Sequence, residues 1–392
     1  MDIDKEKLLI VGGLAIRMIK ANGMDTQVFL SGDLDEAIQG ADYILAQIRV
    51  GKLQARILDE KIPLKFNLLG QETTGAGGFM KALRTIPPIM DIARKIEKLA
   101  PSAWFINFSN PSGIIAEAVL NHTAVKMIGL CNGPINMIGN AMRMLPEGTQ
   151  RFEYDFIGLN HLCWLTGVYA DGREIFQEKL SAGIETNELK NIPQAKYDLL
   201  LLKTIKGLPI SYLDYYYFHE EQVELCKKAE KTRGEICMGI ESELLKMYKD
   251  PDLKEKPAIL DKRGGALYSE AAVSLIDAIE NDKSEIHVVN IKNNGACPFM
   301  EKDDIVEVKS VVNRKWATPI ITQNFDDQYI MGLMRAVKAY EKLTCKAGLH
   351  GDYGTALAAL MAHTLIRDYK KAKGVLDEML EANREFLPQF YR

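Results

Sequence analysis

The apolar positions in residues 1–150 alternate between a helical and an extended spacing. Leu8, Val11, Leu14 and Met18 recur at intervals of three and four residues, which predicts an amphipathic helix. Apolar runs predict strands at residues 26–30, 43–49, 103–108 and 125–130, with helices at residues 34–40, 89–99 and 114–122 and a loop at residues 50–69. Strands that alternate with helices indicate a parallel sheet with helices on both faces.

Beyond residue 150 the pattern changes. Strands are predicted at residues 151–160, 163–169, 286–291 and 305–311, and long helices at residues 235–248, 265–280, 326–346 and 355–383. We therefore predict two domains. Residues 1–150 form a Rossmann-like, doubly wound α/β domain, and residues 151–392 form a mixed α+β domain for catalysis, substrate binding and oligomerisation.

Polar side chains stand where several of these strands end. Arg49, Asn110 and Cys131 each lie at the carboxyl end of a predicted strand, where parallel sheets bind their ligands. His161 also follows a predicted strand, at the end of Gly158-Leu159-Asn160-His161. A thiolate and an imidazole that the fold brings together can hold a divalent metal. The alternative is a buried thiol and a core histidine, which is the commoner role of each residue alone.

The glycine fingerprint of a dinucleotide-binding fold is missing from the sequence. Such folds open with a strand, a G-x-G-x-x-G turn and a helix. Gly12 and Gly13 lie within a helical pattern, and Gly75-Ala76-Gly77-Gly78 follows no predicted strand. Met1-Asp2 resembles the end of the second strand of such a fold. We therefore expect an N-terminally truncated Rossmann-like domain without its first strand, turn and helix.

Composition and charge argue against several classes of protein. Of the 392 residues, 47% are hydrophobic and 26% are charged, which is typical of globular proteins. A net charge of −4 gives no support for nucleic-acid or membrane-surface binding. No apolar run reaches the roughly 18 residues of a membrane span. The six cysteines have no C-x-x-C spacing, which favours free thiols and a cytoplasmic location.

Seven stretches, in order, resemble glycoside hydrolase family 4, the NAD- and metal-dependent glycosidases, over essentially the whole chain. They are Gln47-Ile48-Arg49-Val50-Gly51, Asp59-Glu60-Lys61-Ile62-Pro63-Leu64-Lys65, Gly70-Gln71-Glu72-Thr73, Asn107-Phe108-Ser109-Asn110-Pro111, Cys131-Asn132-x-Pro134, Gly158-Leu159-Asn160-His161 and Val289-Asn290-x-x-Asn293-Asn294-Gly295. The tetrad at Cys131 is similar to the C-N-x-P of 6-phospho-β-glucosidases, although Gly133 stands where Val or Ile is usual.

The resemblance implies a redox route to hydrolysis, without the usual pair of catalytic carboxylates. NAD accepts a hydride from sugar C3, the acidified C2 proton is removed, the aglycone is eliminated, and water addition and reduction complete the cycle. A divalent metal, Mn²⁺ in the family, acts as a Lewis acid at the C3 oxygen. The implied partners are a phosphorylated disaccharide or an aryl glucoside phosphate. A homodimer or homotetramer is expected, with no nucleic-acid or membrane partner.

The resemblance assigns roles near the metal and the cofactor. Cys131 and His161 would be the metal ligands, and Asn132 would contact the substrate beside the metal. Asn110 would bond the sugar hydroxyls, although it could also cap the helix that follows. Asn107 is expected to contact the cofactor.

The catalytic base implied by the resemblance is a tyrosine. The stretch Ser211–Tyr217 contains four tyrosines, and from the spacing to Arg233 we favour Tyr212, with Tyr216 second. A phenol has an ordinary pKa of about 10, so a neighbouring cation or metal must lower it, and Arg233 could do so. The other tyrosines are expected to pack against neighbouring side chains.

Charged residues of the first half complete the implied site. Arg56 resembles the arginine that grips the 6-phosphate, for which a planar guanidinium is suited. The alternative for Arg56 is an ion pair with an acidic neighbour. Arg49 is expected to contact the phosphate or the cofactor, Glu72 the substrate, and Asp2 the adenosine ribose.

Three alternatives compete with this interpretation. The first is a different glycoside or phosphoglycoside substrate, because of Gly133. The second is an inactive or impaired truncated member of the family, since the missing glycine turn would hold the pyrophosphate. The third is a 2-hydroxy-acid dehydrogenase, which shares the nucleotide-binding half but does not use a Cys–His metal pair.

Overall fold

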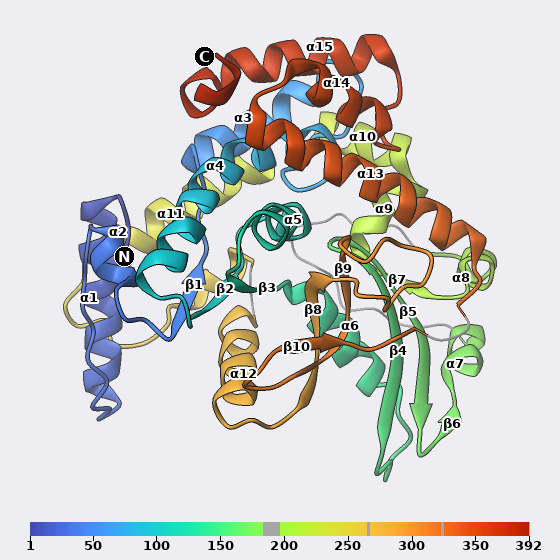
Figure 1. Cartoon of the computed structure of the whole chain (residues 1–392), viewed down its shortest axis with the longest axis horizontal. Coiled ribbons are helices and arrows are strands. Elements are labelled where there is room, and N and C mark those ends of the chain that lie inside the picture. The colour runs from blue at the N-terminus through green and yellow to red at the C-terminus, as the bar shows by residue number, and fades with distance from the viewer. Residues whose placement is uncertain (183–196, 265–266, 323–324, 392) are drawn as a thin grey trace.

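A six-stranded sheet forms the centre of the protein. The computed structural model describes residues 1–182, 197–264, 267–322 and 325–391 (Figure 1). The sheet contains, in spatial order, β1 (Tyr43–Ala46), β2 (Trp104–Asn107), β3 (Lys126–Gly129), β8 (Glu285–Lys292), β9 (Ile305–Val312) and β10 (Ala317–Pro319). β1, β2 and β3 are parallel, and β8 pairs antiparallel with β3 at Gly129 and Asn290. Strands from both predicted domains therefore share one sheet.

Helices cover both faces of the parallel strands. Successive side chains of β2 point to opposite faces of the sheet. Phe105 joins the core formed with α4 (Gly75–Leu99) and α5 (Ser112–His122), whereas Ile106 joins a second core formed with α12 (Tyr268–Glu280). This arrangement confirms the predicted Rossmann-like α/β architecture.

A second sheet carries the corner at which His161 lies. β4 (Phe152–Leu159), β6 (Arg173–Glu174) and β7 (Leu208–Pro209) each pair antiparallel with β5 (Leu162–Ala170). β4 and β5 are joined by the two residues Asn160 and His161, and His161 has a left-handed backbone with φ 63°. The predicted strands and the turn at Asp171 and Gly172 are confirmed.

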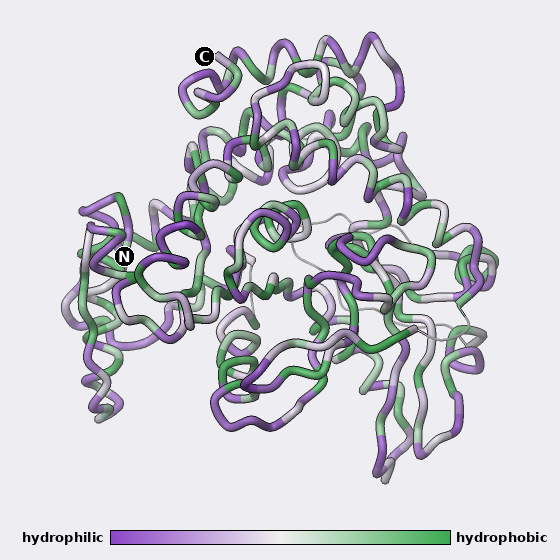
Figure 2. The backbone as a smooth tube through the Cα atoms, in the orientation of Figure 1, coloured by the Kyte–Doolittle hydropathy of each residue, from purple (hydrophilic) through white to green (hydrophobic). Residues whose placement is uncertain are grey.

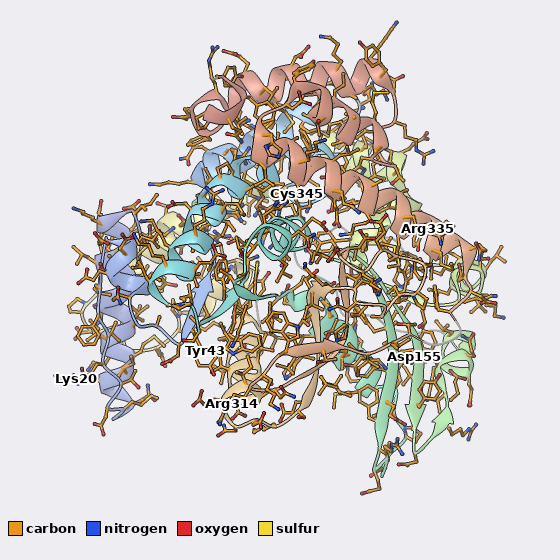
Figure 3. All side chains as sticks on the ribbon, viewed as in Figure 1. Lys20, Tyr43, Asp155, Arg314, Arg335 and Cys345 are labelled. Atoms are coloured by element: carbon orange, nitrogen blue, oxygen red, sulfur yellow. The ribbon has the colours of Figure 1, made fainter. Side chains whose placement is uncertain are left out.

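The C-terminal helices pack on helices of the first half. α13 (Gln328–His350), α14 (Tyr353–Ala362) and α15 (Tyr369–Ala382) lie against α3 (Lys52–Leu64), α4 and α5, at the top of Figure 1. Cys345 of α13 is buried in this packing (Figure 3). Hydrophilic and hydrophobic positions alternate along α15, as expected for a helix with one face on the core (Figure 2).

Shorter elements connect these layers. The remaining helices are α1 (Lys5–Ala21), α2 (Leu34–Ile38), α6 (Asn132–Met142), α7 (Phe176–Ala182), α8 (Leu199–Ile205), α9 (Asp214–Tyr217), α10 (His219–Lys228) and α11 (Arg233–Tyr248). The 3₁₀ helices are η1 (Ser211–Leu213), η2 (Ala258–Lys262), η3 (Arg384–Phe386) and η4 (Pro388–Phe390). None of the helices in the described residues combines the length and the apolar composition that crossing a membrane requires.

Two predicted elements of the first half are wrong. Residues 26–30 form no strand, because Leu30 packs on Gly12 of α1 while Phe29 is 83% exposed. Residues 50–69 are not a loop but contain α3. Its buried face includes Arg56, Asp59 and Glu60 as well as apolar side chains, so the charges interrupt the hydrophobic pattern.

Two predicted helix boundaries are also wrong. α4 begins at Gly75 and runs through Pro87 and Pro88 to Leu99, rather than starting after the prolines. Most of its residues between Gly75 and Ile96 are buried, and this packing offsets the hydrogen bonds that proline removes. The single helix predicted at residues 355–383 is two helices, α14 and α15, with a break from His363 to Asp368.

Candidate active site

A cavity of about 2090 Å³ lies where β1 and β2 end and is lined by both halves of the chain. Its walls include α3, the part of α4 from Lys81 to Ile92, the start of α6, η1, α11 and α12. Seven of the residues that the sequence predicts for the site line this cavity: Asp2, Arg49, Arg56, Glu72, Asn110, Asn132 and Tyr212. The volume exceeds that of a typical site for one small ligand, so a dinucleotide and a sugar phosphate could share it.

The predicted metal ligands meet at Tyr212. Cys131 caps the start of α6, where its Sγ accepts a hydrogen bond from the Gly133 backbone N–H at 3.4 Å. The imidazole of His161 lies against the phenol ring of Tyr212, with centroids 3.9 Å apart and an angle of 8° between the planes. Cys131 also acts electrostatically on Tyr212. His161 is therefore in direct contact with Tyr212, and Cys131 is near enough to act on the same tyrosine through its charge.

The protonation state of His161 suits a metal ligand, whereas the thiol of Cys131 would first have to lose its proton. Burial lowers the pKa of His161 to about 3, so the imidazole is neutral at physiological pH. Its Nδ1 is buried and has no hydrogen-bond partner among the described residues. Burial raises the pKa of Cys131, so the free thiol keeps its proton until a metal displaces it.

Three cations surround the carboxylate of Glu72. The Arg56 Nη1 and Lys81 Nζ atoms each lie 2.8 Å from an oxygen of Glu72, and Arg49 forms a third ion pair. Burial acts to raise the pKa of Glu72, but the three cations outweigh it and hold that pKa well below its usual value. Arg56 also binds Glu60 through its Nε at 2.8 Å. The cluster is an anion-binding surface that already contains one carboxylate.

Lys81 is a site residue that the sequence analysis missed. It is 5% exposed, lines the cavity, and lies in the otherwise apolar stretch Phe79–Leu83 at the start of α4. Burial, together with the charge of Arg49, lowers the pKa of Lys81 to about 8. A single lysine within an apolar helical run is the signal that could have identified it.

The cation that acts on Tyr212 is Arg56 rather than Arg233. Burial is the main cause that raises the pKa of Tyr212, and Cys131 and Glu72 add to it. A hydrogen bond with Thr73 and the charge of Arg56 act in the opposite direction but do not outweigh burial. The protein groups alone therefore raise the pKa of Tyr212, and the expected lowering by a neighbouring arginine is not observed.

Arg233 lies elsewhere. It starts α11, donates to the Lys262 carbonyl oxygen at 2.7 Å, and does not line the described part of the cavity. The described contacts of Arg233 therefore give no support to its predicted role beside Tyr212.

The asparagines of the predicted site have different environments. Asn110 lines the cavity, and its Oδ1 is buried without a partner among the described residues. Asn132 also lines the cavity, at the first turn of α6. Asn107 does not, because its amide bonds the backbone of Ser109 in both directions at 3.0 Å and is fully buried. The predicted cofactor contact of Asn107 is therefore replaced by a role in shaping the loop between β2 and α5.

The residue that caps α5 is Asn160. Its Oδ1 accepts from the backbone N–H groups of Ser112 at 3.0 Å and Gly113 at 3.4 Å, so Asn110 does not perform this role. The Nδ2 of Asn160 donates to Glu307 Oε1 at 3.2 Å, and Asn290 donates to the same oxygen at 2.8 Å. This buried network fixes the residue that immediately precedes His161.

Comparison with known protein families gives matches over both halves of the chain. The model described as family 4 glycosyl hydrolase matches residues 1–147, and the model of the C-terminal domain of the same family matches residues 156–366. The two matches together cover most of the chain.

Individual proteins of known name are similar over nearly the full length. A probable 6-phospho-beta-glucosidase of Bacillus subtilis is 41% identical over 394 residues, which cover 99% of this chain and 89% of that protein. The structure of the 6-phospho-beta-glucosidase from Thermotoga maritima with manganese, NAD⁺ and glucose-6-phosphate has a TM-score of 0.86 at 32% identity, covering 98% of this chain and 90% of that chain. A 6-phospho-alpha-glucosidase from gut microorganisms, with NAD and Mn²⁺, has a TM-score of 0.83 at 26% identity, with 99% and 91% covered.

Proposed function

The chain belongs to glycosyl hydrolase family 4, and we propose that it hydrolyses 6-phospho-β-glucosides with NAD and a divalent metal, Mn²⁺, as cofactors. The stack of Tyr212 on His161, beside Cys131 and within reach of the cations around Glu72, carries this proposal. These residues would supply a base, a pair of metal ligands and an anion-binding surface beside one cavity. The higher identity to the β-specific relative than to the α-specific structure supports the β-glucoside.

Cys131 and His161 suit a divalent metal. The buried Nδ1 of His161 has no partner among the described residues, and a thiol of raised pKa lies beside the same tyrosine. The described residues contain no group of three or more such side chains placed to hold a metal. Two protein ligands leave positions for substrate oxygens, as a catalytic metal requires. The bound metal supplies a Lewis acid for the sugar C3 oxygen.

The remaining volume of the cavity suits the dinucleotide. Its lining extends from Tyr212, which stacks on His161, past Arg49 and Asn110 to Asp2. Asp2 is placed to accept hydrogen bonds from ribose hydroxyls, as an acidic residue does in dinucleotide folds. NAD, when bound, supplies a reversible hydride acceptor for C3.

The residues of the chain then have distinct tasks. Oxidation at C3 acidifies the C2 proton, and Tyr212 Oη removes it as a general base. Arg56 and Lys81 hold the 6-phosphate, and Arg49 assists them or contacts the cofactor. Asn110 and Asn132 orient the sugar hydroxyls.

Glu72 is the carboxylate that contacts the substrate. Because Glu72 neutralises part of the charge of its three cations before substrate binds, it also limits their affinity for other anions.

The division of the chain follows from these assignments. We assign the NAD site to residues 1–150 and the base, with much of the α+β structure, to residues 151–392. The boundary between the two family matches, residues 147 to 156, supports this division. A homodimer or homotetramer in the cytoplasm, without nucleic-acid or membrane partners, completes the proposal. Six cysteines that are all free thiols support the reducing compartment.

Hydrolysis of 4-nitrophenyl β-glucoside 6-phosphate tests the function. The assay contains a thiol reductant and is run with and without NAD⁺ and Mn²⁺. We expect turnover that requires both, and little with the α-anomer or with the substrate without phosphate. Turnover that persists without NAD⁺ would contradict the mechanism, and preference for the α-anomer would contradict the substrate. No turnover on any substrate, with cofactors bound, would favour an inactive family member.

A further inference from the structure

Gly133 leaves a space that another side chain fills. A Cβ atom at this position in the first turn of α6 would lie 2.5 Å from Ile210 Cδ1 and 3.5 Å from Cys131 Sγ. A contact of 2.5 Å between two carbon atoms is far inside van der Waals distance. Ile210 therefore occupies the volume that any larger residue at position 133 would need.

Ile210 has little freedom to yield. Its side chain is 1% exposed, and its backbone N–H donates to the Cys163 carbonyl oxygen at 3.0 Å. β7 ends at Pro209, directly before Ile210, and pairs with β5. The backbone of Ile210 is thus anchored to the second sheet, and only a displacement larger than a rotation of its Cδ1 methyl can relieve would pass to the residues that follow.

Those residues carry the proposed catalytic base. The carbonyl oxygen of Ile210 accepts from Leu213 N–H at 2.8 Å, which closes the 3₁₀ turn η1 around Tyr212. Tyr212 in turn lies 3.9 Å from His161, centroid to centroid. One chain of packed groups therefore runs from the residue after Asn132 to the base.

We propose that Gly133 and Ile210 form a complementary pair that sets the position of Tyr212 over His161. Both are positioning residues: neither supplies a polar side chain to the cavity, and both act through the turn that holds Tyr212. The inference rests on the proposed function for the role of Tyr212, but not for the packing itself.

A graded set of substitutions tests the pair. Gly133→Ala adds one carbon, which a rotation of the Ile210 Cδ1 methyl could relieve, and Gly133→Val adds two more that rotation cannot relieve. Ile210→Val removes Cδ1, the atom at 2.5 Å, and Ile210→Ala removes more. Each substitution at position 133 is combined with its partner, as Gly133→Ala/Ile210→Val and Gly133→Val/Ile210→Ala.

Steady-state kinetics with 4-nitrophenyl β-glucoside 6-phosphate, NAD⁺ and Mn²⁺ measure the effect. We expect Gly133→Val to lower kcat by about 100-fold with KM within about threefold, because misplacing a reacting group by about 1 Å has an effect of this size. The double variant should recover kcat by tenfold or more over Gly133→Val. A kcat within twofold of the unchanged protein for Gly133→Val, or a double variant no better than the single one, would overturn the proposal.

Gly139→Val is the matched control. It makes the same change in the same helix, at a position where an added Cβ meets nothing within 4 Å. It should leave kcat unchanged, and a large loss there would show that valine in α6 is itself harmful. If Gly133→Val does not fold by itself, the proposal requires that Gly133→Val/Ile210→Ala restores folding, which a thermal unfolding curve measures, and a double variant that also fails to fold would overturn it.

Crystal structures separate the packing from the activity. In Gly133→Val the centroids of Tyr212 and His161 should be farther apart than 3.9 Å, and in the double variant they should return to it. An unchanged stack in Gly133→Val would refute the inference even if kcat had fallen. If the stack moves in Gly133→Val but the unchanged protein hydrolyses no glycoside, the packing relationship between Gly133 and Ile210 is supported and the proposed function is rejected.

Discussion

The phenol ring of Tyr212 lies flat on the imidazole of His161, with centroids 3.9 Å apart and planes 8° apart. Because the two rings are in contact, the position of the proposed base and the position of a proposed metal ligand depend on each other. His161 is fixed by the corner between β4 and β5, and Tyr212 by the turn after β7. The proposed base is therefore aligned by the same packing that aligns the proposed metal ligand.

Removing the hydroxyl of Tyr212 should remove the base and leave the stack. Tyr212→Phe keeps the ring against His161, so we expect little change in the thermal midpoint and in KM. The value of kcat should fall by about 10²–10⁴-fold, the usual contribution of a general base. Steady-state kinetics and a thermal unfolding curve check both parts.

Tyr216→Phe is the control for this substitution. Tyr216 was the second choice from the sequence, and it packs against His363 rather than His161. We expect kcat within a few-fold of the unchanged protein. If kcat falls further in Tyr216→Phe than in Tyr212→Phe, the base is Tyr216 and not Tyr212.

The metal pair predicts a selective loss of Mn²⁺ affinity. Cys131→Ser or His161→Ala removes one of two protein ligands, and we expect the dissociation constant for Mn²⁺ to rise by more than about tenfold, since even outer-shell changes have effects of that order. The electron paramagnetic resonance signal of free Mn²⁺ measures binding without turnover. Chelation of the metal should likewise abolish hydrolysis, with recovery on adding Mn²⁺.

A buried cysteine outside the site provides the comparison. Cys345→Ala changes a thiol of α13 that is 3% exposed and does not line the cavity. It should alter stability but leave the affinity for Mn²⁺ within about twofold. Equal losses in Cys345→Ala and Cys131→Ser would mean that the metal responds to general destabilisation and that Cys131 is not a ligand.

Part of the site could be predicted because its residues end strands. Arg49, Asn110 and Cys131 follow short apolar runs, and parallel strands bring such ends to one edge of a sheet. The contact of Tyr212 with His161 could not be predicted in the same way. It joins residues of two separate turns, and only the pairing of β7 with β5 brings the turns together.

The pairing of β8 with β3 in the central sheet also could not be predicted from the local sequence pattern. β8 follows β3 by more than 150 residues and meets it at one residue pair, Gly129 and Asn290. Residues 26–30 have strand-forming composition but pack on α1 through Leu30, so tertiary contact overrides propensity there. In α3 the buried charges of Arg56 and Glu60 conceal a helix, because ion pairs replace apolar contacts on its buried face.

Arg56 should be important for both stability and phosphate recognition. Arg56→Met leaves Glu60 and Glu72 with fewer partners, and breaking a buried ion pair costs about 3–5 kcal/mol. Urea unfolding measures this loss. Arg56→Lys keeps the charge but not the planar pair of donors, so the preference in kcat/KM for phosphorylated over unphosphorylated substrate should fall by about tenfold or more.

Arg94→Met is a matched change on the exposed face of α4. It should alter the free energy of unfolding by less than about 0.5 kcal/mol and leave the phosphate preference unchanged. If Arg56→Lys lowers activity equally on both substrates, Arg56 does not bind the phosphate.

Glu307 should make stability depend on pH in a particular direction. Burial raises the pKa of Glu307 from 4.5 to about 7, against opposing hydrogen bonds from Asn290, Asn160 and Cys163. A carboxyl whose pKa is higher in the folded state stabilises that state fully below pH 4.5, and this contribution is lost as the pH rises to about 7. The glutamine of Glu307→Gln is neutral at every pH, so that variant does not lose this contribution to stability as the pH rises.

The measurement is a difference between two proteins at several pH values. We expect the free energy of unfolding of the unchanged protein, minus that of Glu307→Gln, to fall by up to about 3 kcal/mol between pH 4.5 and 7.5. Urea unfolding in a chelator keeps metal binding out of the comparison. Glu255→Gln, at an exposed position, corrects for the loss of one charge and should give a flat difference.

A flat difference for Glu307→Gln as well would mean that the buried carboxyl beside Asn160 titrates as it does in the unfolded chain. A difference that rises with pH would mean that the network stabilises the ionised form, so that Glu307 would hold Asn160 as a carboxylate rather than as an acid.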